Sequence, residues 1–572
     1  MAYKAPVSEL QFLFDNVVGF DRLTQTERFA EATTDLRDAI LSEGARLAEQ
    51  VLAPLNRQGD LHPARLENGV VRTSPGFAQG YRAIAEGGWI GISADPEHGG
   101  MGLPQTLAVA LNEMMSSACL SLSLNPLMSQ GQIEALEAHA SDEIKALYLP
   151  KLISGEWCGT MNLTEPQAGS DVGALRTRAE PNGDGTYAIT GQKIFISWAD
   201  SDFAGNICHL VLARLPDGVP GTRGISLFMV PKYIPDENGE PGEANSLHVV
   251  SLEHKLGIHG SPTAVMQYDG ATGWLIGAPH AGMKAMFTMM NNARLGVGTE
   301  GLGVAEAAFQ QALEYALERK QGRSPVKGGT GTIFDHADVR RMLIAMRAQI
   351  NAARAIIYDT ALSTDMAKAT GDAAMAARAA LLTPIAKAFG TDTGITVASL
   401  GIQVHGGMGF IEETGAAQYL RDVRVTAIYE GTNGIQAMDL VGRKLIDGGA
   451  AADALLDEVA ATAAAAQGSL PDLGAALSSA ADEMRATVRW MVGQGDFNNR
   501  FAGAVPFLRA FALVLGGHYL LRGALATGGK GARADLARFF IRRLMPQHAA
   551  LCLEAREGQE GLYALSADDL SA

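Results

Sequence analysis

The sequence predicts an α+β protein in which a helical segment, a strand-rich segment and two further helical segments follow one another along 572 residues. Apolar residues recur every three or four positions from about residue 23 to 161, which is the spacing of amphipathic helices. Short β-rich runs separated by turn residues replace this spacing between about residues 159 and 274. Helical patterns then return. Strands that are not interleaved with helices favour an α+β class over an alternating α/β fold.

The first helical segment contains two clear periodic runs, Phe29–Leu55 and Ile133–Ile153. Between them, the stretch Glu97–Pro104 (EHGGMGLP) is dense in glycine and ends in proline. Glycine and proline interrupt helices, so we expect a loop there.

The strand-rich segment consists of short runs of β-branched and apolar residues. Asn182–Gly185 (NGDG) is a strong hairpin-turn signal between two of these runs. Closely spaced strands without helices between them predict a small antiparallel barrel or sandwich. The expected strands are Tyr187–Thr190, Ile207–Ala213, Ile225–Val230, Leu247–Ser251 and Thr263–Tyr268.

The segment after the strands contains three long helical patterns, Gly303–Lys320, Asp335–Ala361 and Ala373–Ser399, and Pro384 predicts a kink in the third. A glycine- and alanine-rich hinge, Asp447–Ala452, precedes an alanine-rich tail that keeps helical periodicity. We therefore expect a packed helical domain at the C-terminus. The predicted domains are an N-terminal extension with a helical domain (1–160), a β domain (161–278), a helical domain (279–446) and an additional helical domain (453–572).

Composition narrows the class of protein. The net charge of −16 argues against a nucleic-acid binder, which normally carries a basic patch. The four cysteines are scattered without a CxxC pair and the twelve histidines form no HExxH motif, so we expect neither a disulfide framework nor a metal site. The N-terminus does not resemble a secretory signal, and no stretch approaches 18 uninterrupted apolar residues. These features predict a cytoplasmic protein without a transmembrane segment.

Residues Gly296–Gly301 (GVGTEG) match the GxGxxG pattern of dinucleotide-binding proteins. That motif requires a preceding strand and a following helix within a βαβ unit. The preceding residues, Met283–Leu295, are rich in methionine and have no β character. We interpret the glycines as sites of close helix packing, and NAD is not the expected cofactor.

Two segments near the start of the strands carry polar groups suited to a ligand. In Thr164–Gly173 (TEPQAGSDVG), hydroxyls, glycine and backbone amides at a turn could hydrogen-bond a polar ring edge. An ordinary capped loop is the alternative. In Gly191–Ser197 (GQKIFIS), Phe195 is either an aromatic contact for a ligand or part of the β-domain core.

Two later segments have groups suited to phosphate. Arg319, in Ala316–Arg323 (ALERKQGR), lies at a helix end, and the forked geometry of a guanidinium suits an anionic group. A solvated helix end is the alternative. The paired glycines in Gln403–Phe410 (QVHGGMGF) allow backbone amides close approach to a phosphate, or they simply end a helix. His405 is better explained as a structural residue than as a catalytic one.

The order and spacing of these four segments resemble the acyl-CoA dehydrogenase family over about residues 60 to 445. The resemblance implies a helical domain, a β domain and a four-helix-bundle domain, with FAD as cofactor, and this sequence adds an extra helical domain at its C-terminus. It also implies a set of cofactor-binding residues: Met161, Leu163, Thr164, Ser170, Phe195, Ser197, Arg319, Gln403, Gly406, Gly407, Thr432 and Gly434. Phe195 departs from the tryptophan common in relatives, and Gln321 stands where many relatives have an aromatic residue.

The same resemblance assigns a catalytic base. The family's base lies in a YEGT sequence, and Glu430 occupies that place in Tyr429–Gln436 (YEGTNGIQ). In relatives, the base removes the α-proton of an acyl-CoA while the β-hydride passes to FAD. Substrate contacts are implied for Ser170, Asn291 and Arg294, although several relatives have Asp where this sequence has Asn291. An apolar, closed site is expected to raise the pKa of Glu430.

The resemblance also implies partners. The loop Gln403–Phe410 contacts the FAD of a neighbouring subunit in relatives, which predicts a homodimer or a dimer of dimers. An electron-transfer flavoprotein is the expected electron acceptor. The N-terminal stretch Tyr3–Leu23 and the tail beyond Leu445 resemble the branch of 3-methylmercaptopropionyl-CoA dehydrogenases of dimethylsulfoniopropionate catabolism.

Other functions remain open at this point. A general short- or medium-chain acyl-CoA dehydrogenase of fatty acid metabolism is the close alternative. A flavin monooxygenase or nitroalkane oxidase on the same fold is disfavoured, because these enzymes tend to replace the glutamate at the position of Glu430. A non-catalytic assembly factor on this fold belongs to a different functional class.

Overall fold

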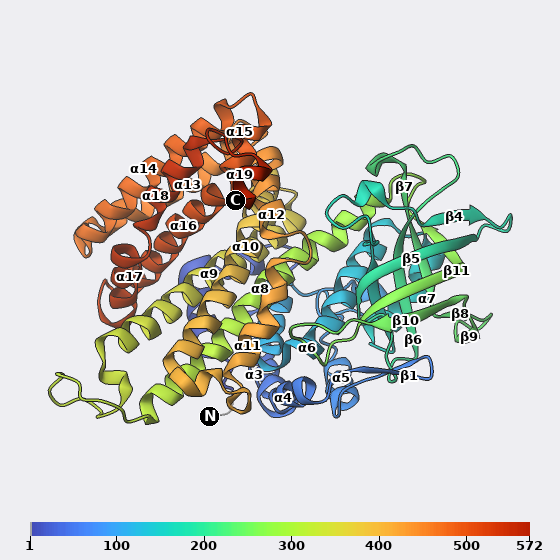
Figure 1. The fold of residues 1–572 in the computed structure, drawn as a ribbon, viewed down its shortest axis with the longest axis horizontal. Helices are drawn as coiled ribbons and strands as arrows, with labels where there is room; N and C mark the ends of the chain where they lie inside the picture. Colours follow the sequence, from blue (N-terminus) through green and yellow to red (C-terminus); the bar gives the residue numbers. More distant parts are fainter. Residues whose placement is uncertain (1–2) are drawn as a thin grey trace. The chain divides into compact units, whose positions relative to one another are not determined.

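The computed structural model describes residues 3–572, which form two compact units. We call residues 35–296, with a short N-terminal stretch, the sheet unit. Residues 6–34 and 297–572 form the helical unit. The boundary between the units lies within the long helix α8 (Gly282–Glu318; Figure 1).

The sheet unit contains helices that precede the strands in sequence. These helices are α3 (Thr34–Leu47), α4 (Ala53–Leu61), α5 (Phe77–Glu86), α6 (Gln105–His139) and α7 (Asp142–Ile153). The predicted loop Glu97–Pro104 is confirmed, because only the short 3-10 turn Pro96–His98 lies between α5 and α6. Helix α6 is the longest of these five and changes direction at Cys119, which has a non-helical φ of −159°.

All five predicted strands are present, and the structure adds others. The strands are β1 (Arg65–Glu67), β2 (Val70–Arg72), β3 (Trp157–Asn162), β4 (Arg178–Pro181), β5 (Tyr187–Ser197), β6 (Asn206–Arg214), β7 (Ile225–Pro231), β8 (Tyr233–Pro235), β9 (Pro241–Ala244), β10 (Leu247–Leu252) and β11 (Thr263–Ile276). The hairpin-turn prediction at Asn182–Gly185 is also confirmed, since these residues connect β4 to β5.

The main sheet has seven strands in the order β10-β11-β5-β4-β6-β3, with β7 paired to both β11 and β6. Because β7 bridges these two strands, the sheet curls back on itself as the predicted barrel would. The sheet is mixed, however, whereas the sequence predicted an all-antiparallel one: β3 runs parallel to β6, and β4 meets β6 in parallel at one residue pair. The sequence of β3, WCGTMN, is short and lacks alternation, so this parallel strand gave no strand signal.

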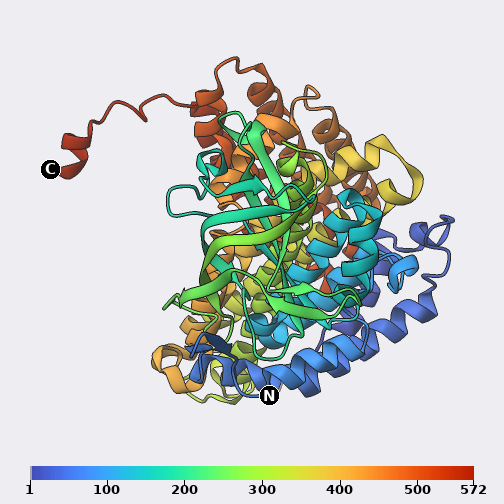
Figure 2. The ribbon, with the colours of Figure 1, turned by 90° about the vertical axis from the view of Figure 1, so that its right-hand side faces the viewer.

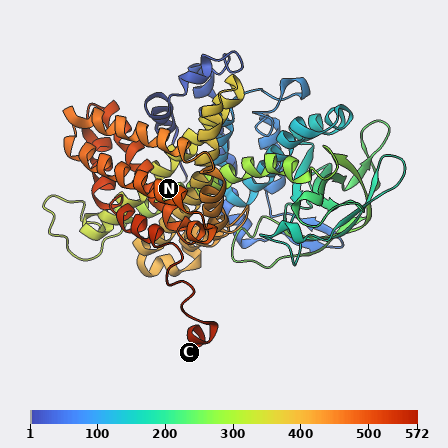
Figure 3. The same cartoon turned by 90° about the horizontal axis from the view of Figure 1, so that it is seen from above.

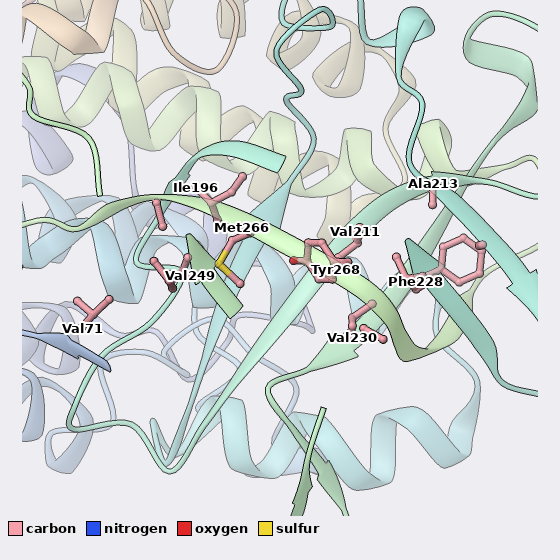
Figure 4. Close-up of a cluster of buried hydrophobic side chains, with 14 of the residues drawn as sticks. Val71, Ile196, Val211, Ala213, Phe228, Val230, Val249, Met266 and Tyr268 are labelled. Carbon is pink, nitrogen blue, oxygen red and sulfur yellow. The ribbon is translucent and has the colours of Figure 1, made fainter. Parts of the chain in front are cut away.

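The core of this sheet is formed by apolar side chains from most of its strands (Figure 4). Tyr268, Phe228 and Met266 are its largest fully buried members. Val71, from the small β1–β2 hairpin, packs at one end of the cluster. Burial of this kind contributes about 1.5–3 kcal/mol for each large apolar side chain.

The helical unit has three long helices with a further set of helices beyond them (Figure 3). Helix α8 ends at Glu318, and the segment 319–332 loops away from the helices before α9 begins. The remaining helices are α1 (Val7–Leu13), α2 (Asp21–Thr24), α9 (Ala337–Thr370), α10 (Ala373–His405), α11 (Ala416–Val423), α12 (Asn433–Asp439), α13 (Ala450–Ala465), α14 (Pro471–Gly493), α15 (Phe497–Ala502), α16 (Ala504–Ala526), α17 (Gly531–Arg543), α18 (Gln547–Glu557) and α19 (Ala567–Ser571).

The C-terminal tail is helical as predicted, and its last residues, from about 558 to α19, run away from the other helices of the unit (Figure 2). The N-terminal extension packs within the same unit. Arg533 of α17 binds both carboxylate oxygens of Glu9 in α1 at 2.9 Å. Phe14 lies edge-on to Tyr358 of α9, with ring centroids 5.4 Å apart. The two regions that exceed the minimal family size therefore contact each other.

Two helices, α6 and α16, are long and apolar enough to cross a membrane by length and composition. Their apolar windows are 100% and 83% buried inside the protein. Such burial is the pattern of core helices in a globular protein.

The glycines of the GxGxxG match lie inside helix α8, and no strand leads directly into them, because the preceding strand β11 ends at Ile276, before α8 begins. A β-carbon added to Gly298 would lie 2.7 Å from the carbonyl oxygen of Ala386 in α10. One added to Gly301 would lie 2.5 Å from the carbonyl oxygen of Gly390. The interpretation of these glycines as sites of close helix packing is confirmed, because the backbones of α8 and α10 approach each other there.

Replacing Gly301 by alanine should therefore destabilise the helical unit. The added methyl group would press against backbone that cannot rotate away, at a cost of about 1–3 kcal/mol. We expect a lower midpoint of thermal unfolding. Gly493, at the end of α14, has nothing within 4 Å of a built β-carbon, so Gly493→Ala is the matched control and should not lower the midpoint. Equal midpoints for the two variants would contradict the packing role.

Candidate functional site

The structure brings two of the predicted segments together in the sheet unit. The backbone N–H of Ile194 donates to the carbonyl oxygen of Thr164 at 2.9 Å. The Lys193 ammonium donates to the carbonyl oxygen of Leu163 at 3.0 Å. The segments Thr164–Gly173 and Gly191–Ser197, which are separated in the sequence, thus form one local surface beside strand β5.

Phe195 is an exposed aromatic side chain on that surface and has unusual backbone geometry. It is 59% exposed, although it lies in a strand whose other face is core. Its φ is 61°, in the left-handed region that non-glycine residues rarely adopt. The register of β5 against β11 shifts here, so that Ile196 faces Ala264 while Lys193 faces Met266. A bulge of this kind re-aims a side chain, and in this case it turns the aromatic ring outward.

The hydroxyls predicted to bind the cofactor are available. Within residues 3–572, the side chains of Thr164, Ser170 and Ser197 form no hydrogen bond. Met161 and Leu163 are partly exposed, while Ser170 is exposed. An exposed aromatic ring next to unpaired hydroxyls and backbone amides suits a flat, polar ring system.

A buried ion pair beneath this surface was missed by the sequence reasoning. Glu165 and Lys193 are 4% and 0% exposed, and the Lys193 ammonium lies 2.8 Å from a Glu165 oxygen. The Glu165 carboxylate also accepts from the Arg176 N–H at 2.7 Å and from the Thr177 hydroxyl at 2.6 Å. Burial by itself raises the pKa of Glu165, but the Lys193 ammonium and these donors together lower it to about 2. The pair anchors both segments at their centre.

Two substrate-contact candidates, Asn291 and Arg294, lie in the part of α8 that belongs to the sheet unit. Asn291 is exposed, whereas Arg294 is only 4% exposed. A neighbour that was not predicted, Asn292, donates to Glu134 of α6 at 2.9 Å.

The phosphate-binding candidates lie in the helical unit. Arg319 directly follows the end of α8 and is exposed, and its guanidinium forms no hydrogen bond or ion pair with any of residues 3–572. Its backbone is fixed, because Ile333 N–H donates to the Arg319 carbonyl oxygen at 2.8 Å. A fixed backbone with an unpaired guanidinium is suited to an anionic ligand.

The segment Gln403–Phe410 ends helix α10. Gly406 has a φ of 61° and allows the chain to leave the helix, and neither Gly406 nor Gly407 has any atom within 4 Å of a built β-carbon. Gln403 is exposed, and its side chain forms no hydrogen bond within the described residues. His405 is buried, bonded to the Gly401 carbonyl oxygen at 2.7 Å and stacked on Tyr315, which fits a structural role.

Glu430 is half-buried and has a φ of 56°, so it is the second non-glycine site residue in the left-handed region, after Phe195. The Gln436 amide donates to the Glu430 carbonyl oxygen at 3.1 Å and to the Gly431 carbonyl oxygen at 3.3 Å. Such backbone strain persists only where the surroundings hold it, and it is frequent at active sites. The strained residue is the one that the sequence predicts as the catalytic base.

The residues after Glu430 begin helix α12. The Thr432 hydroxyl accepts from the Ile435 N–H at 3.2 Å and caps the helix. A β-carbon added to Gly434 would have only the Thr432 hydroxyl within 4 Å, at 3.7 Å, so the backbone is accessible there. Among the described residues, no group of three or more His, Cys, Asp or Glu side chains could hold a metal ion.

Family models for the N-terminal, middle and C-terminal domains of acyl-CoA dehydrogenase match residues 34–156, 160–271 and 280–445, and an acetyl-CoA dehydrogenase C-terminal-like model matches 455–566. A 3-methylmercaptopropionyl-CoA dehydrogenase from Ruegeria pomeroyi is 45% identical over 561 residues, covering 94% of this chain and 92% of the relative. This chain belongs to the acyl-CoA dehydrogenase family.

Solved structures agree on the fold. Caenorhabditis elegans ACDH-11, in complex with C11-CoA, has a TM-score of 0.78 at 22% identity and covers 93% of this chain and 90% of its own. An acyl-CoA dehydrogenase complexed with FAD from Bacillus anthracis has a TM-score of 0.73 at 21% identity, with coverage of 97% and 92%. The predicted α+β fold of this family, with its additional helical C-terminal part, is confirmed.

Family membership makes this acyl-CoA dehydrogenase an FAD-dependent oxidoreductase. The residues present fit the cofactor. The outward Phe195 with its unpaired hydroxyl neighbours suits the flavin ring, and the unpaired Arg319 suits a pyrophosphate. The open backbone at Gly406 allows close approach of a ligand.

Proposed function

We propose that this protein dehydrogenates 3-methylmercaptopropionyl-CoA to methylthioacryloyl-CoA in the bacterial cytoplasm, as a step of dimethylsulfoniopropionate catabolism. The main support for the proposed reaction is the geometry of Glu430. Its side chain is half-buried, and its neighbours hold its backbone at a φ of 56°. The choice of acyl chain is supported by the Ruegeria pomeroyi relative, which matches nearly the full length of both chains.

In the proposed mechanism, the Glu430 carboxylate takes the α-proton of the thioester. The backbone N–H of Glu430 donates to the thioester carbonyl oxygen and stabilises the negative charge that develops there. When bound, FAD would supply the acceptor for the hydride that leaves the β-carbon. Arg294 and Asn291 bind the CoA chain, and Ser170 contributes to binding both CoA and the flavin.

We propose that the other residues of the site bind the cofactor. Met161, Leu163, Thr164, Phe195 and Ser197 would hold the flavin ring. Arg319, Gln403, Gly406 and Gly407 would bind the pyrophosphate and adenosine part. Thr432 and Gly434 complete the flavin contacts. The two electrons gained in each turnover must leave for an acceptor, for which we propose an electron-transfer flavoprotein.

A panel of acyl-CoA substrates tests the proposed function. Purified enzyme is assayed with 3-methylmercaptopropionyl-CoA, pentanoyl-CoA and longer straight chains, and kcat/KM is measured with an artificial electron acceptor. Pentanoyl-CoA replaces the sulfur by a methylene and is the matched control. We expect these two to be the best substrates, because each added methylene changes recognition by about 1–3 kcal/mol.

Two outcomes would change the proposal. A tenfold preference for longer chains would favour the general acyl-CoA dehydrogenase of fatty acid metabolism. A flavin spectrum that no acyl-CoA bleaches would instead support a non-catalytic assembly factor. The two outcomes are distinguished by separate measurements. Chain-length preference is measured from turnover, whereas bleaching of the flavin is measured without turnover.

We also propose a homodimer. The segment after helix α10 exposes apolar side chains: Phe410 is 84% exposed, Met408 47% and Ile411 44%. Contiguous exposed apolar residues favour an interface. In the family this loop reaches the FAD of a neighbouring subunit, so association and cofactor retention should be linked.

The variant Phe410→Asp should weaken the dimer, because it places a charge in an apolar contact. Light scattering should give the mass of a dimer for the wild type and a larger monomer fraction for the variant. The flavin-to-protein absorbance ratio should fall in parallel. Phe497→Asp, at a residue 54% exposed in α15, is the control and should keep both values. A monomeric wild type with full FAD content would refute the proposal.

A further inference from the structure

A second glutamate, Glu300, lies close to the proposed base. It belongs to helix α8 and is 1% exposed. The hydroxyl of Tyr429, the residue before Glu430, donates a short hydrogen bond to its Oε2. Its Oε1 has no hydrogen-bond partner within residues 3–572. A buried carboxyl group with one oxygen that accepts no hydrogen bond requires an explanation. An ionised carboxylate at such a site would raise the free energy of the folded protein.

The charges around Glu300 explain how it is accommodated. Burial raises its pKa and the charge of Glu430 adds to this, whereas the Tyr429 hydrogen bond and the Lys387 ammonium lower it, with a net pKa of about 8. Lys387, on α10, is 0% exposed and donates to the Asn433 side-chain oxygen at 3.0 Å. With this pKa the Glu300 carboxyl is mostly protonated and neutral at pH 7, and its Oε2 accepts the hydrogen bond from Tyr429.

Glu300 is connected to the proposed base, Glu430, through a single residue, Tyr429. Tyr429 immediately precedes Glu430, so fixing the Tyr429 hydroxyl fixes the entry of the chain into the left-handed residue. Gln436 fixes the other side through the carbonyl oxygens of Glu430 and Gly431. The αL conformation of Glu430 needs such support on both sides.

We propose that Glu300 is a positioning residue for Glu430: its protonated carboxyl holds Tyr429 in place and leaves Glu430 as the only charged carboxylate of the pair. This proposal rests on the proposed function, in which Glu430 is the base. It adds a group outside the YEGT motif, supplied by helix α8, to the control of the reaction.

A dependence on pH follows. The titratable groups that face Glu300 are Tyr429 and Glu430 from the loop before α12 and Lys387 from α10. As pH rises through about 8, Glu300 loses its proton and a second negative charge appears beside Glu430. That charge opposes the negative charge that develops on the thioester oxygen, so kcat should fall on the alkaline side.

The variant Glu300→Gln tests the effect of the charge on residue 300 while keeping the shape of its side chain. The amide keeps an oxygen that accepts from Tyr429, but it cannot ionise. We expect the wild-type kcat to fall as pH rises above 8 and the variant to lack this decrease. Glu300→Ala and Tyr429→Phe remove the hydrogen bond and should lower kcat at pH 7 by about fivefold, with a smaller change in KM. Glu300→Gln should lose less than either.

Infrared spectroscopy of the FAD-loaded protein tests the protonation state without turnover. The wild type at pH 7 should show the C=O band of a protonated carboxyl that Glu300→Gln lacks and that disappears as pH rises through about 8. Glu306→Gln is the control, because Glu306 lies on the same helix but pairs with Arg354 at 2.8 Å. Burial raises the pKa of Glu306, but Arg347 and Arg354 lower it to about 2, so its removal should delete no such band.

Two results would overturn the proposal: an unchanged alkaline decrease in Glu300→Gln, or the same carboxyl band in that variant as in the wild type. Its failure is distinguishable from failure of the proposed function. Full turnover by Glu430→Gln would remove the base assignment, whereas the infrared band reports on Glu300 whichever residue is the base.

Discussion

Glu430→Gln should bind FAD and acyl-CoA and yet lose turnover by about 10²- to 10⁴-fold, the usual contribution of a general base. The amide has the shape of the carboxyl group but cannot accept the α-proton. It leaves the backbone N–H of residue 430 unchanged, so the thioester carbonyl can still be polarised. The measurement is the rate at which the flavin absorbance bleaches after anaerobic mixing with the substrate.

The control for this prediction is Glu413→Gln, which removes the charge of an exposed glutamate in the same unit. It should bleach at the wild-type rate. Binding is followed separately, by the spectral perturbation of the flavin on addition of a non-oxidisable acyl-CoA. Near-wild-type bleaching by Glu430→Gln would mean that another residue is the base.

Much of the fold was predictable because local patterns and tertiary contacts agree. The helix that contains Ala373–Ser399 and the strand that contains Ile207–Ala213 were predicted from apolar spacing, and both occur with extended ends as α10 and β6. The parallel pairing of β3 with β6 was not predictable. Strand direction depends on which strands are neighbours, and this information is absent from local periodicity.

At the candidate site, too, the local sequence pattern does not predict which side chains are buried. Alternation along Gly191–Ser197 places Lys193 and Phe195 on one face of a strand. In the structure the bulge at Phe195 separates them, so that Lys193 is fully buried and Phe195 is 59% exposed. The φ of 61° at Phe195 that makes this possible leaves no mark in the sequence, because phenylalanine does not favour it.

Glu300 was missed for a different reason. It lies inside the glycine-rich run of α8, which was interpreted only as a packing surface. A single acidic residue within a run of small residues was the available signal, since a charge on a closely packed helix face requires a partner. Its partner, Tyr429, is 129 positions away in the sequence. The division of the chain at residues 160, 278 and 446 and the roles of the individual site residues remain predictions.

The regions beyond the family's minimal length have a structural explanation. Glu9 in the N-terminal extension pairs with Arg533 in the C-terminal helices, and the Arg533 guanidinium lies 3.3 Å from the centre of the Phe12 ring. These contacts hold the N-terminal extension against the C-terminal helices within the helical unit.

Lys193→Met should lower the stability of the sheet unit by about 3–5 kcal/mol, the usual cost of leaving one charge of a buried pair without its partner. Glu165 would remain 4% exposed, with its carboxylate facing an apolar side chain. The segments that carry Thr164 and Phe195 would lose their common anchor, so FAD content should fall as well. Thermal unfolding and the flavin-to-protein absorbance ratio measure the two effects.

The double variant Lys193→Met/Glu165→Gln is the control and should recover part of the stability, because no buried charge remains.

The pH dependence of stability gives a sharper test of the Glu165–Lys193 pair. In the wild type, the pKa of Glu165 is lowered to about 2 from the usual 4.5, so the stability it contributes is present above pH 4.5 and is lost as pH falls towards 2. In Lys193→Met, burial without the ammonium raises that pKa, and protonation relieves the buried charge. Acidification from pH 6 to pH 4 should therefore narrow the difference in unfolding midpoint between the wild type and Lys193→Met. A difference that stays constant or widens over this range would show that the Lys193 ammonium does not neutralise Glu165.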